Sequence, residues 1–403
     1  MATVVLLGTL DTKGHEYDYL RARLLEQGVE VILVDAGVFE PQVQADIPQD
    51  EVAAAAGADI AALREAGDRG AAVETMCRGS AEIVRGLFEA GQLDGILTVG
   101  GSGNSSIGAA AMQALPVGIP KLLVSTVASG DTRPYVGATD VSMTYSVVDI
   151  SGLNRISERI LSNAAGAIAG MAKVVFVETE DARPLIGATM FGVTTPAVTR
   201  ARERLEELGY EVLVFHATGT GGQSMEALAK GGYLAGVLDL TTTELADELV
   251  GGVLSAGPER LTAAGAVGVP QVVSLGALDM VNFGPRETVP PQFEGRNIYV
   301  HNPTVTLMRT TPEECAELGA QIARKLSAAT GPTALFVPLK GVSMIATEGG
   351  PFHDAAADEA LFSALRDGLG PNVELHELDL DVNDPAFADA AADRLHAMIQ
   401  EAK

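Results

Sequence analysis

The chain has 403 residues, of which 47% are hydrophobic and 45 are glycine, and its formal net charge at pH 7 is −26. This length predicts two domains, and this composition predicts a well-packed α/β protein and excludes a disordered chain. The negative charge argues against nucleic acid and anionic membranes as partners, because both are bound by basic surfaces.

The amino terminus predicts a strand rather than a targeting segment. MATVVLLGTLD has no cationic stretch and reaches an acidic residue at Asp11. No apolar run approaches the roughly 20 residues that a membrane span needs. Cys77 and Cys315 lie far apart and predict core thiols rather than a disulfide framework. We therefore expect a cytoplasmic protein that does not enter a membrane.

In the first half, short apolar runs alternate with helical patterns. Such runs are typical of buried parallel strands, and they occur at residues 3–7, 29–34, 94–99 and 121–125. Residues 50–92 are alanine-rich and predict two or three helices broken near Gly67–Gly70. A helix over residues 154–171 and a strand over residues 174–177 are expected to complete this half.

The third strand runs into a glycine-rich turn, GGSGNSS, before a helix resumes at Ile107. Backbone N–H groups at such a helix start, together with the dipole of the helix, form a cradle for an anion, most naturally phosphate. The alternative is a glycine-rich turn capped by Ser or Asn. The cradle candidates for binding a cofactor are Gly100, Gly101, Ser102, Gly103, Asn104 and Ser105.

Other polar clusters also follow strands, and the carboxyl ends of parallel strands converge on the ligand crevice of an open α/β sheet. These further candidates for cofactor binding are Thr9, Asp11, Thr12, Lys13, Asp35, Thr126, Ser129 and Gly130. Lys13 is the natural charge partner for phosphate, and Asp35 lies where such folds bind ribose. Asp11 or Asp131 is a candidate ligand for Mg²⁺. For Asp11 and Thr12 the alternative is helix capping.

The sequence lacks the signatures of several common sites. GGSGNSS matches neither the Walker A motif nor the dinucleotide motif G-x-G-x-x-G, which argues against a P-loop NTPase and a standard dehydrogenase. The six histidines are scattered and form no pair at metal-ligand spacing, which argues against a zinc site.

The second half repeats the plan of the first, beginning with a strand expected over residues 185–190. ELGYEV echoes EQGVEV, LAGVL echoes LDGIL, and VGVPQVV echoes VGIPKLL, in the same order. Residues 331–403 add two further strand–helix units. The fold class predicted is therefore α/β, with two Rossmann-like three-layer αβα domains, mostly parallel sheets and an internal duplication. We place the domains at residues 1–182, which bind nucleotide, and residues 183–403.

Polar residues at the strand ends of the second half are candidates for catalysis. They supply an imidazole, two carboxylates, an amide and a guanidinium, from His216, Asp239, Asp279, Asn282 and Arg309. Such a set suits acid–base chemistry on a small anion. The alternative is structural, because Thr241 with Glu244 forms a capping box and buried polar turns are common.

Eight segments resemble one known family: GTLDTKG, TVGGSG, LPVGIPKLLVSTVASGD, ATMFGVTTP, VFHATGTGG, VLDLTTTELADELVGG, GALDMVNFG and HNPTVTLMRTT. Over nearly its whole length the chain is similar to the Tm-one-like ATP-binding family, a bacterial uncharacterised family related to the N-terminal domain of the tomato mosaic virus resistance protein. The family pattern continues the cradle as GGSGGT, whereas this chain has Asn104 and Ser105.

The resemblance implies two Rossmann-like subdomains, ATP binding with Mg²⁺ and a homodimer. In the plant relative this region binds a viral replication protein. Relatives in this family are often fused to, or encoded beside, a TIM-barrel protein, so the resemblance implies a separate TIM-barrel protein as a possible partner.

Together these observations predict a cytoplasmic, Mg²⁺-dependent ATP-binding protein. We expect it to act on or sense a small carboxylate or sugar-acid metabolite in the interdomain cleft. One alternative is a nucleotide-independent metabolic enzyme whose GGSG cradle binds an anionic substrate. A second is a non-catalytic regulator or scaffold that binds a protein partner. The sequence leaves open whether the protein is an enzyme.

Overall fold

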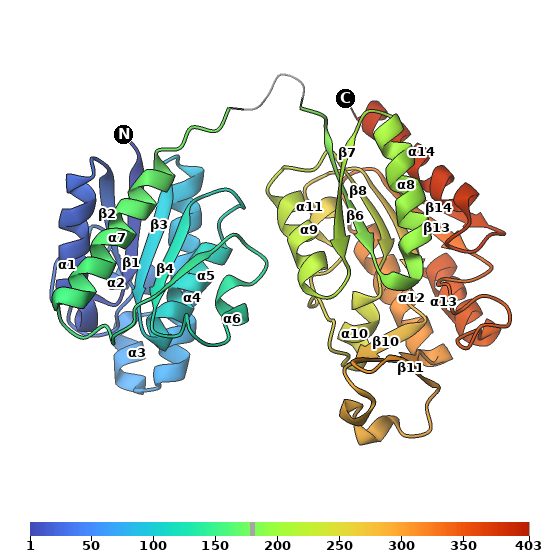
Figure 1. Cartoon of the computed structure of the whole chain (residues 1–403), viewed down its shortest axis with the longest axis horizontal. Helices are drawn as coiled ribbons and strands as arrows, with labels where there is room; N and C mark the ends of the chain where they lie inside the picture. Colours follow the sequence, from blue (N-terminus) through green and yellow to red (C-terminus); the bar gives the residue numbers. More distant parts are fainter. Residues whose placement is uncertain (178–181, 403) are drawn as a thin grey trace. The chain divides into compact units, whose positions relative to one another are not determined.

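The computed structural model describes residues 1–177 and 182–402 and shows an α/β fold in two compact units, residues 1–178 and 179–403 (Figure 1). The boundary expected between residues 182 and 183 adjoins residues 178–181, which lie outside the described part of the chain. Two domains with parallel sheets confirm the predicted fold class.

The N-terminal domain contains one parallel sheet of five strands in the order β2-β1-β3-β4-β5. The strands are β1 (Thr3–Gly8), β2 (Glu30–Asp35), β3 (Gly95–Gly100), β4 (Lys121–Ser125) and β5 (Ser142–Tyr145). β1 pairs with β2 on one side and with β3 on the other, so the order of the strands reverses at β1 and β3. Open α/β sheets bind ligands at this switch point, outside the carboxyl ends of the strands.

Helices cover both faces of this sheet (Figure 1). The helices of this domain are α1 (Leu10–Glu26), α2 (Gln49–Ala55), α3 (Ile60–Ala66), α4 (Arg69–Glu89), α5 (Ser102–Gln113), α6 (Arg133–Val136) and α7 (Arg155–Ala172). α1 and α7 share one core with the sheet, while α2, α4 and α5 share another. The apolar face of α7, including Leu161, Ala165 and Ile168, is buried against its own sheet. Two cores on opposite faces give the three-layer arrangement.

The strand predicted over residues 174–177 is wrong. These residues follow α7 and pair with no strand, and Val175 and Phe176 are 82% and 83% exposed. Four consecutive apolar residues suit a buried strand, but the five-stranded sheet is complete without them.

The C-terminal domain contains a parallel sheet of six strands in the order β14-β13-β9-β8-β6-β7. Its strands are β6 (Leu185–Met190), β7 (Glu211–His216), β8 (Gly236–Thr241), β9 (Gln271–Gly276), β13 (Thr333–Pro338) and β14 (Val373–Leu378). Read from β7, its first four strands repeat the order of β2, β1, β3 and β4. A small antiparallel sheet, β10-β12-β11, is formed by β10 (Met280–Phe283), β11 (Ile298–Asn302) and β12 (Val305–Arg309).

Seven α-helices surround these sheets in the part of the C-terminal domain that the structure describes. They are α8 (Thr195–Glu207), α9 (Thr220–Lys230), α10 (Glu244–Val250), α11 (Ala263–Ala266), α12 (Pro312–Ser327), α13 (Ala355–Gly368) and α14 (Pro385–Glu401). Short 3₁₀ turns lie at Gly192–Thr194, Arg286–Thr288 and Pro291–Phe293. α8 and α14 cover one face of the sheet, and α10, α12 and α13 contribute to the core on the other.

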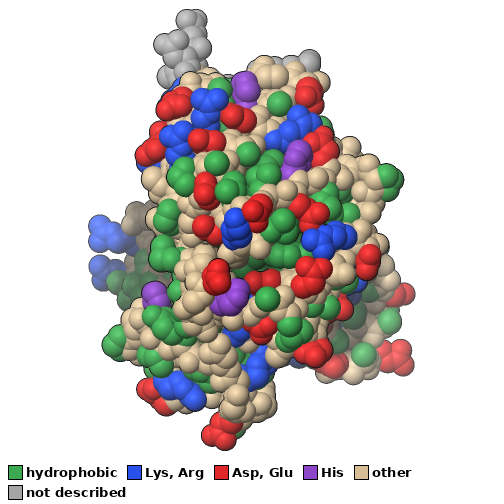
Figure 2. Space-filling model, turned by 90° about the vertical axis from the view of Figure 1, so that its right-hand side faces the viewer, with side chains coloured by type: hydrophobic (Ala, Val, Ile, Leu, Met, Phe, Trp, Pro, Cys, Tyr) green, Lys and Arg blue, Asp and Glu red, His purple; other side chains and the backbone are tan. Residues whose placement is uncertain are grey.

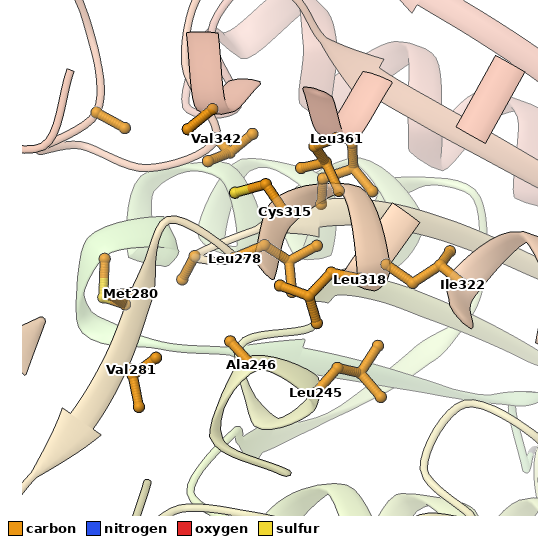
Figure 3. Packing of buried hydrophobic residues seen from close by; sticks show 14 of the residues in the cluster. Leu245, Ala246, Leu278, Met280, Val281, Cys315, Leu318, Ile322, Val342 and Leu361 are labelled. Carbon is orange, nitrogen blue, oxygen red and sulfur yellow. The ribbon is translucent and has the colours of Figure 1, made fainter. Parts of the chain in front are cut away.

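The core formed with α10, α12 and α13 contains one of the two cysteines. Figure 3 shows Cys315 of α12 among Leu278, Val342 and Leu361, and the thiol is free. On the face of the molecule shown in Figure 2, acidic and basic side chains are interspersed with apolar ones and form no extended basic surface. No helix in the described ranges is long and apolar enough to cross a membrane.

Candidate functional site

A pocket of about 640 Å³ lies at the carboxyl ends of β1, β2 and β3, at the switch point of the N-terminal sheet. Binding sites for small molecules and cofactors usually measure about 300–1,000 Å³. Eight of the residues predicted to bind a cofactor line it: Thr9, Asp11, Thr12, Lys13, Gly101, Ser102, Gly103 and Asn104. The structure therefore brings together the residues after the first strand and those after the third.

The first turn of α5 forms one wall of the pocket. Its N-cap is Gly101, which supplies no side-chain hydrogen bond to the helix. The first N–H groups of a helix have no partner within the helix, so the N-terminus of α5 offers donors to an anion. A Cβ placed on Gly103 would have Arg69 Nη2, at 3.8 Å, as its nearest neighbour, which leaves the backbone open to close approach.

Two cations, Lys13 and Arg69, line the same pocket and have no side-chain partner among the described residues. Lys13 lies in the turn that begins α1, where the backbone departs from helical geometry (φ −128°, ψ 15°). Arg69 begins α4 and is exposed. Neither side chain forms a hydrogen bond or ion pair with any residue in the described ranges. Both cations are therefore available to an anion at the α5 N-terminus.

The opposite part of the pocket is apolar. Leu63 of α3, Val73 and Met76 of α4 and Ile107 of α5 line it, and Phe39 lies in the wall with 65% of its surface exposed. An anion cradle beside an apolar wall with an exposed aromatic ring suits a ligand with a charged end and a flat, weakly polar end.

A buried tyrosine links the two strands beside the pocket. The Tyr17 hydroxyl accepts hydrogen bonds from Val99 N (2.8 Å) and Asn104 Nδ2 (3.0 Å) and donates to Leu7 O (2.7 Å). It thus bridges β1 and β3 where the two strands separate. Burial raises the pKa of Tyr17, so the phenol stays protonated. Asn104 turns inward to this hydroxyl, although its position in the sequence predicted a contact with phosphate.

Glycine is required beside this tyrosine for steric reasons. A Cβ on Gly8 would lie 2.0 Å from Tyr17 Cζ, and one on Gly100 would lie 2.7 Å from Asn104 Cβ. Gly100 therefore serves the packing of Asn104 and does not line the pocket.

Asp11 and Asp35 shape the loop that follows β2. Asp11 Oδ2 accepts from Val38 N (3.1 Å) and Phe39 N (3.0 Å), while Asp35 Oδ1 accepts from Leu10 N (3.0 Å) and Gly37 N (2.8 Å). Burial raises the pKa of Asp35. Asp35 is 1% exposed and lies behind the pocket wall, so it holds the loop rather than facing a ribose.

Of the two carboxylates predicted to bind Mg²⁺, Asp11 lines the pocket and accepts two backbone N–H groups, whereas Asp131 lies outside it. Asp131 is exposed, forms an ion pair with Arg133 at 2.6 Å and does not line the pocket. The Arg133 guanidinium lowers the pKa of Asp131 to about 2. Within the described ranges no group of three or more His, Cys, Asp or Glu residues is arranged to hold a metal. These residues do not fit a metal site built by the protein alone.

The remaining cofactor candidates lie outside the pocket. Ser105 Oγ is hydrogen-bonded to Ser125 Oγ (2.6 Å) and joins α5 to β4. Thr126 is half-buried, and Ser129 and Gly130 are exposed in the loop after β4. Sequence reasoning missed Arg64, Arg69 and Asp149, which do line the pocket. The one signal in the sequence was the predicted helix break near Gly67–Gly70, which marks the turn between α3 and α4 beside Arg64 and Arg69.

In the C-terminal domain, a buried ion network occupies the equivalent strand end. Arg260 is fully buried and contacts Asp239 Oδ2 (2.5 Å), Glu244 Oε2 (2.6 Å) and Glu226 Oε1 (3.3 Å). Glu244 Oε1 also accepts from Gly219 N (2.7 Å) and Gly222 N (3.0 Å), at the start of α9. The glycine-rich HATGTGG segment thus binds a carboxylate of its own chain.

The other residues predicted for catalysis lie in two networks: one joins Asn282 to Asp247, and the other contains both Asp279 and Arg309, whose charges interact. Asn282 Nδ2 donates to Asp247 Oδ2 (2.6 Å), and Asp279 Oδ2 accepts from Ser343 Oγ (2.8 Å). Arg309 Nη2 binds Asp358 Oδ1 (2.6 Å). These side chains are buried, whereas His216 is exposed beside Phe191, with 5.5 Å between their ring centroids.

A small cavity lies beside the buried network of Arg260. The cavity that borders Asp239 and Glu226 measures about 10 Å³, which is about the least space that one water molecule needs. Burial raises the pKa of Asp279 to about 6 and that of Asp247 to about 7. Such shifts accompany buried structural networks as well as active sites.

Similarity to other proteins covers both domains. Residues 2–176 match the N-terminal domain of the uncharacterised protein family UPF0261, and residues 183–399 match its C-terminal domain. A UPF0261 protein of Clostridium tetani is 54% identical over 400 residues, 99% of each chain. One from Rhizobium meliloti is 48% identical over 393 residues, 97% of this chain and 98% of that protein.

A plant protein is also related. The ToMV resistance protein Tm-1(GCR237) of Solanum lycopersicum is 39% identical over 414 residues, which cover 97% of this chain and 55% of the tomato protein. Among solved structures, UDP-GlcNAc 2-epimerase from Neisseria meningitidis bound to UDP-GlcNAc aligns over the whole of both chains with 9% identity and a TM-score of 0.23. A score this low supports no statement about activity. The two domain matches and the close relatives show that the chain belongs to the UPF0261 family.

Proposed function

We propose that the protein binds ATP in the pocket of its N-terminal domain. The observation that supports this most is the union, in one pocket of about 640 Å³, of the uncapped α5 N-terminus with Lys13 and Arg69. The phosphates would occupy the cradle, where N–H donors and two cations offset their charge. The base would lie against the apolar wall near Phe39 and Met76.

In this proposal magnesium accompanies the nucleotide. Asp11 is the one candidate carboxylate of the predicted pair that lines the pocket, and its carboxylate already accepts two backbone N–H groups. Phosphate and water oxygens would therefore supply most ligands of the ion. The small carboxylate or sugar-acid metabolite remains a separate proposal. Of the five residues predicted for catalysis, only His216 is exposed to meet it.

We expect Lys13→Ala and Arg69→Ala each to weaken ATP–Mg²⁺ binding by about 10-fold or more, because each removes a charge-assisted hydrogen bond of about 1.5–3 kcal/mol. AMP, which lacks the outer phosphates, should lose less affinity in Lys13→Ala. Isothermal titration calorimetry on the full chain measures both ligands. Arg78→Ala is the matched control for Arg69→Ala. Arg78 lies on the same helix, α4, and pairs with Glu74 away from the pocket.

Two results would remove the assignment. A wild-type protein that does not bind ATP contradicts nucleotide binding and favours an anionic metabolite in the same cradle. Equal losses for ATP and AMP in Lys13→Ala would place Lys13 away from the outer phosphates.

The family resemblance also leads us to propose a homodimer. The alanine-rich face of α7 is buried against its own sheet, so it does not supply the interface. We expect light scattering at micromolar concentration to give twice the 41.6 kDa mass of the chain. A mass equal to that of one chain would contradict the dimer.

A further inference from the structure

Helix α3 forms part of the pocket but is only loosely attached to the domain. None of its residues, Ile60–Ala66, is fully buried, and only Ile60 and Leu63 are half-buried against the core. Elements with few buried apolar contacts open at low free-energy cost, and lids over ligand sites are drawn from such elements. α4, by contrast, buries Met76 and Val84.

The ends of α3 allow it to move as one body. Gly57 and Gly67 flank it with φ angles of +74° and +64°, and a Cβ added to either would meet no atom within 4 Å. Both therefore have room to change conformation, and glycine tolerates such changes at little steric cost. Between them the helix is capped by its own residues, because Asp59 Oδ1 accepts from Ala61 N (2.7 Å) and Gly67 ends it in the left-handed conformation. Local capping keeps the helix intact while the hinges turn.

One polar contact ties α3 to the loop that follows β2. Arg64 Nε donates to Val38 O, in the loop that Asp11 holds through Val38 N and Phe39 N. A guanidinium has five N–H donors, and this is the only hydrogen bond that Arg64 forms with residues in the described ranges. Its remaining donors are free to bind an anion. Leu63, one position earlier, faces the same pocket.

We propose that α3 is a lid over the pocket, and that Arg64 is a ligand-binding residue which also latches it to Val38. The identity of the ligand rests on the proposed nucleotide binding. With ATP bound, α3 closes over the pocket and Leu63 packs against the ligand. Arg64 then contacts a phosphate, as a third cation beside Lys13 and Arg69. Without ligand, the contacts that hold α3 among the described residues are the Val38 bond, two half-buried side chains and the attraction of Arg64 to Asp35.

Hydrogen–deuterium exchange on the full chain tests the lid with and without ATP–Mg²⁺. In the free protein we expect the α3 amides to exchange about 100-fold faster than the buried amides of α4, because α3 opens locally. Arg64→Ala should speed exchange in α3 further, whereas Arg78→Ala should not. Saturating ATP–Mg²⁺ should slow exchange in α3 by about 10-fold and leave α8, in the other domain, unchanged.

The outcomes separate the lid from the nucleotide. α3 amides that exchange as slowly as those of α4, or that are insensitive to Arg64→Ala, overturn the lid. ATP binding detected by calorimetry without slower exchange in α3 also overturns the lid and retains the nucleotide. If calorimetry detects no ATP binding, the nucleotide assignment fails, and the comparison of wild type with Arg64→Ala in the free protein still decides the lid.

Discussion

Arg260→Ala is expected to destabilise the C-terminal domain by about 3–5 kcal/mol, because removing one partner of a buried ion network leaves uncompensated charge. Arg260 is fully buried, and the carboxylates it contacts belong to Asp239, Glu244 and Glu226. Thermal unfolding followed by calorimetry should show a fall of about 10 °C or more in the melting temperature of this domain. The N-terminal domain should be unaffected.

The matched control is Arg200→Ala, since Arg200 forms an ion pair with Asp389 on the surface. Exposed pairs contribute about 1 kcal/mol or less. A second variant separates charge from packing: Arg260→Met with Asp239→Asn and Glu244→Gln removes the cation and two of the anions together. This triple variant should recover part of the lost stability. A melting temperature for Arg260→Ala within about 2 °C of wild type would show that the network is not needed for folding.

Asp247 should make the C-terminal domain less stable as the pH rises. Burial raises the pKa of Asp247 from 3.8 to about 7, so between these values the folded state holds a proton that the unfolded state has released. The contribution of this group to stability is greatest below about pH 4 and falls by about 1.4 kcal/mol per pH unit up to about pH 7, about 4 kcal/mol in all. Asn282 Oδ1, which has no partner among the described residues, can accept a hydrogen bond from the protonated Asp247 carboxyl if the amide turns.

Urea unfolding of wild type and Asp247→Asn between pH 4 and 8 measures this effect. The variant imitates the protonated acid, so it should flatten the pH dependence and equal or exceed wild type in stability at pH 8. Asp379→Asn is the control, because Asp379 is exposed and pairs with Lys340. Parallel pH profiles for wild type and Asp247→Asn would contradict a protonated Asp247. Asp279, with a pKa of about 6, contributes the same pH dependence to wild type and to Asp247→Asn, so it does not affect the comparison.

Most of the fold could be predicted from the sequence because strands in a parallel sheet are buried on both faces and appear as continuous apolar runs. The runs at residues 121–125 and 185–190 agree with β4 and β6 to the residue, and those that predicted β1, β2 and β3 differ by one residue at their ends. The same signal failed at residues 174–177. An apolar run indicates a tendency to be buried. Whether it forms a strand depends on whether the folded sheet offers it a strand to pair with.

The candidate site was predicted in part, for physical reasons. Lys13 and the GGSG turn lie directly after strands, where topology alone brings them together. Arg64 and Arg69 come from the helices after β2, and nothing in their spacing shows that these helices fold back over the strand ends. The roles of Asn104 and Asp239 depend on partners distant in sequence, Tyr17 and Arg260. A pattern of residue types does not distinguish a side chain that meets a ligand from one that meets its own chain.

Glu244 has a consequence for the lifetime of the protein in the cell. It fills the N-terminus of α9 with a carboxylate that is always present, so the C-terminal domain completes its own structure at any metabolite concentration. The N-terminus of α5 has no such built-in anion. A ligand that binds only the folded state lowers the population of opened molecules that proteases attack. Under the proposed function, the population of opened N-terminal domains therefore falls as the supply of their ligand rises, whereas opening of the C-terminal domain does not depend on it.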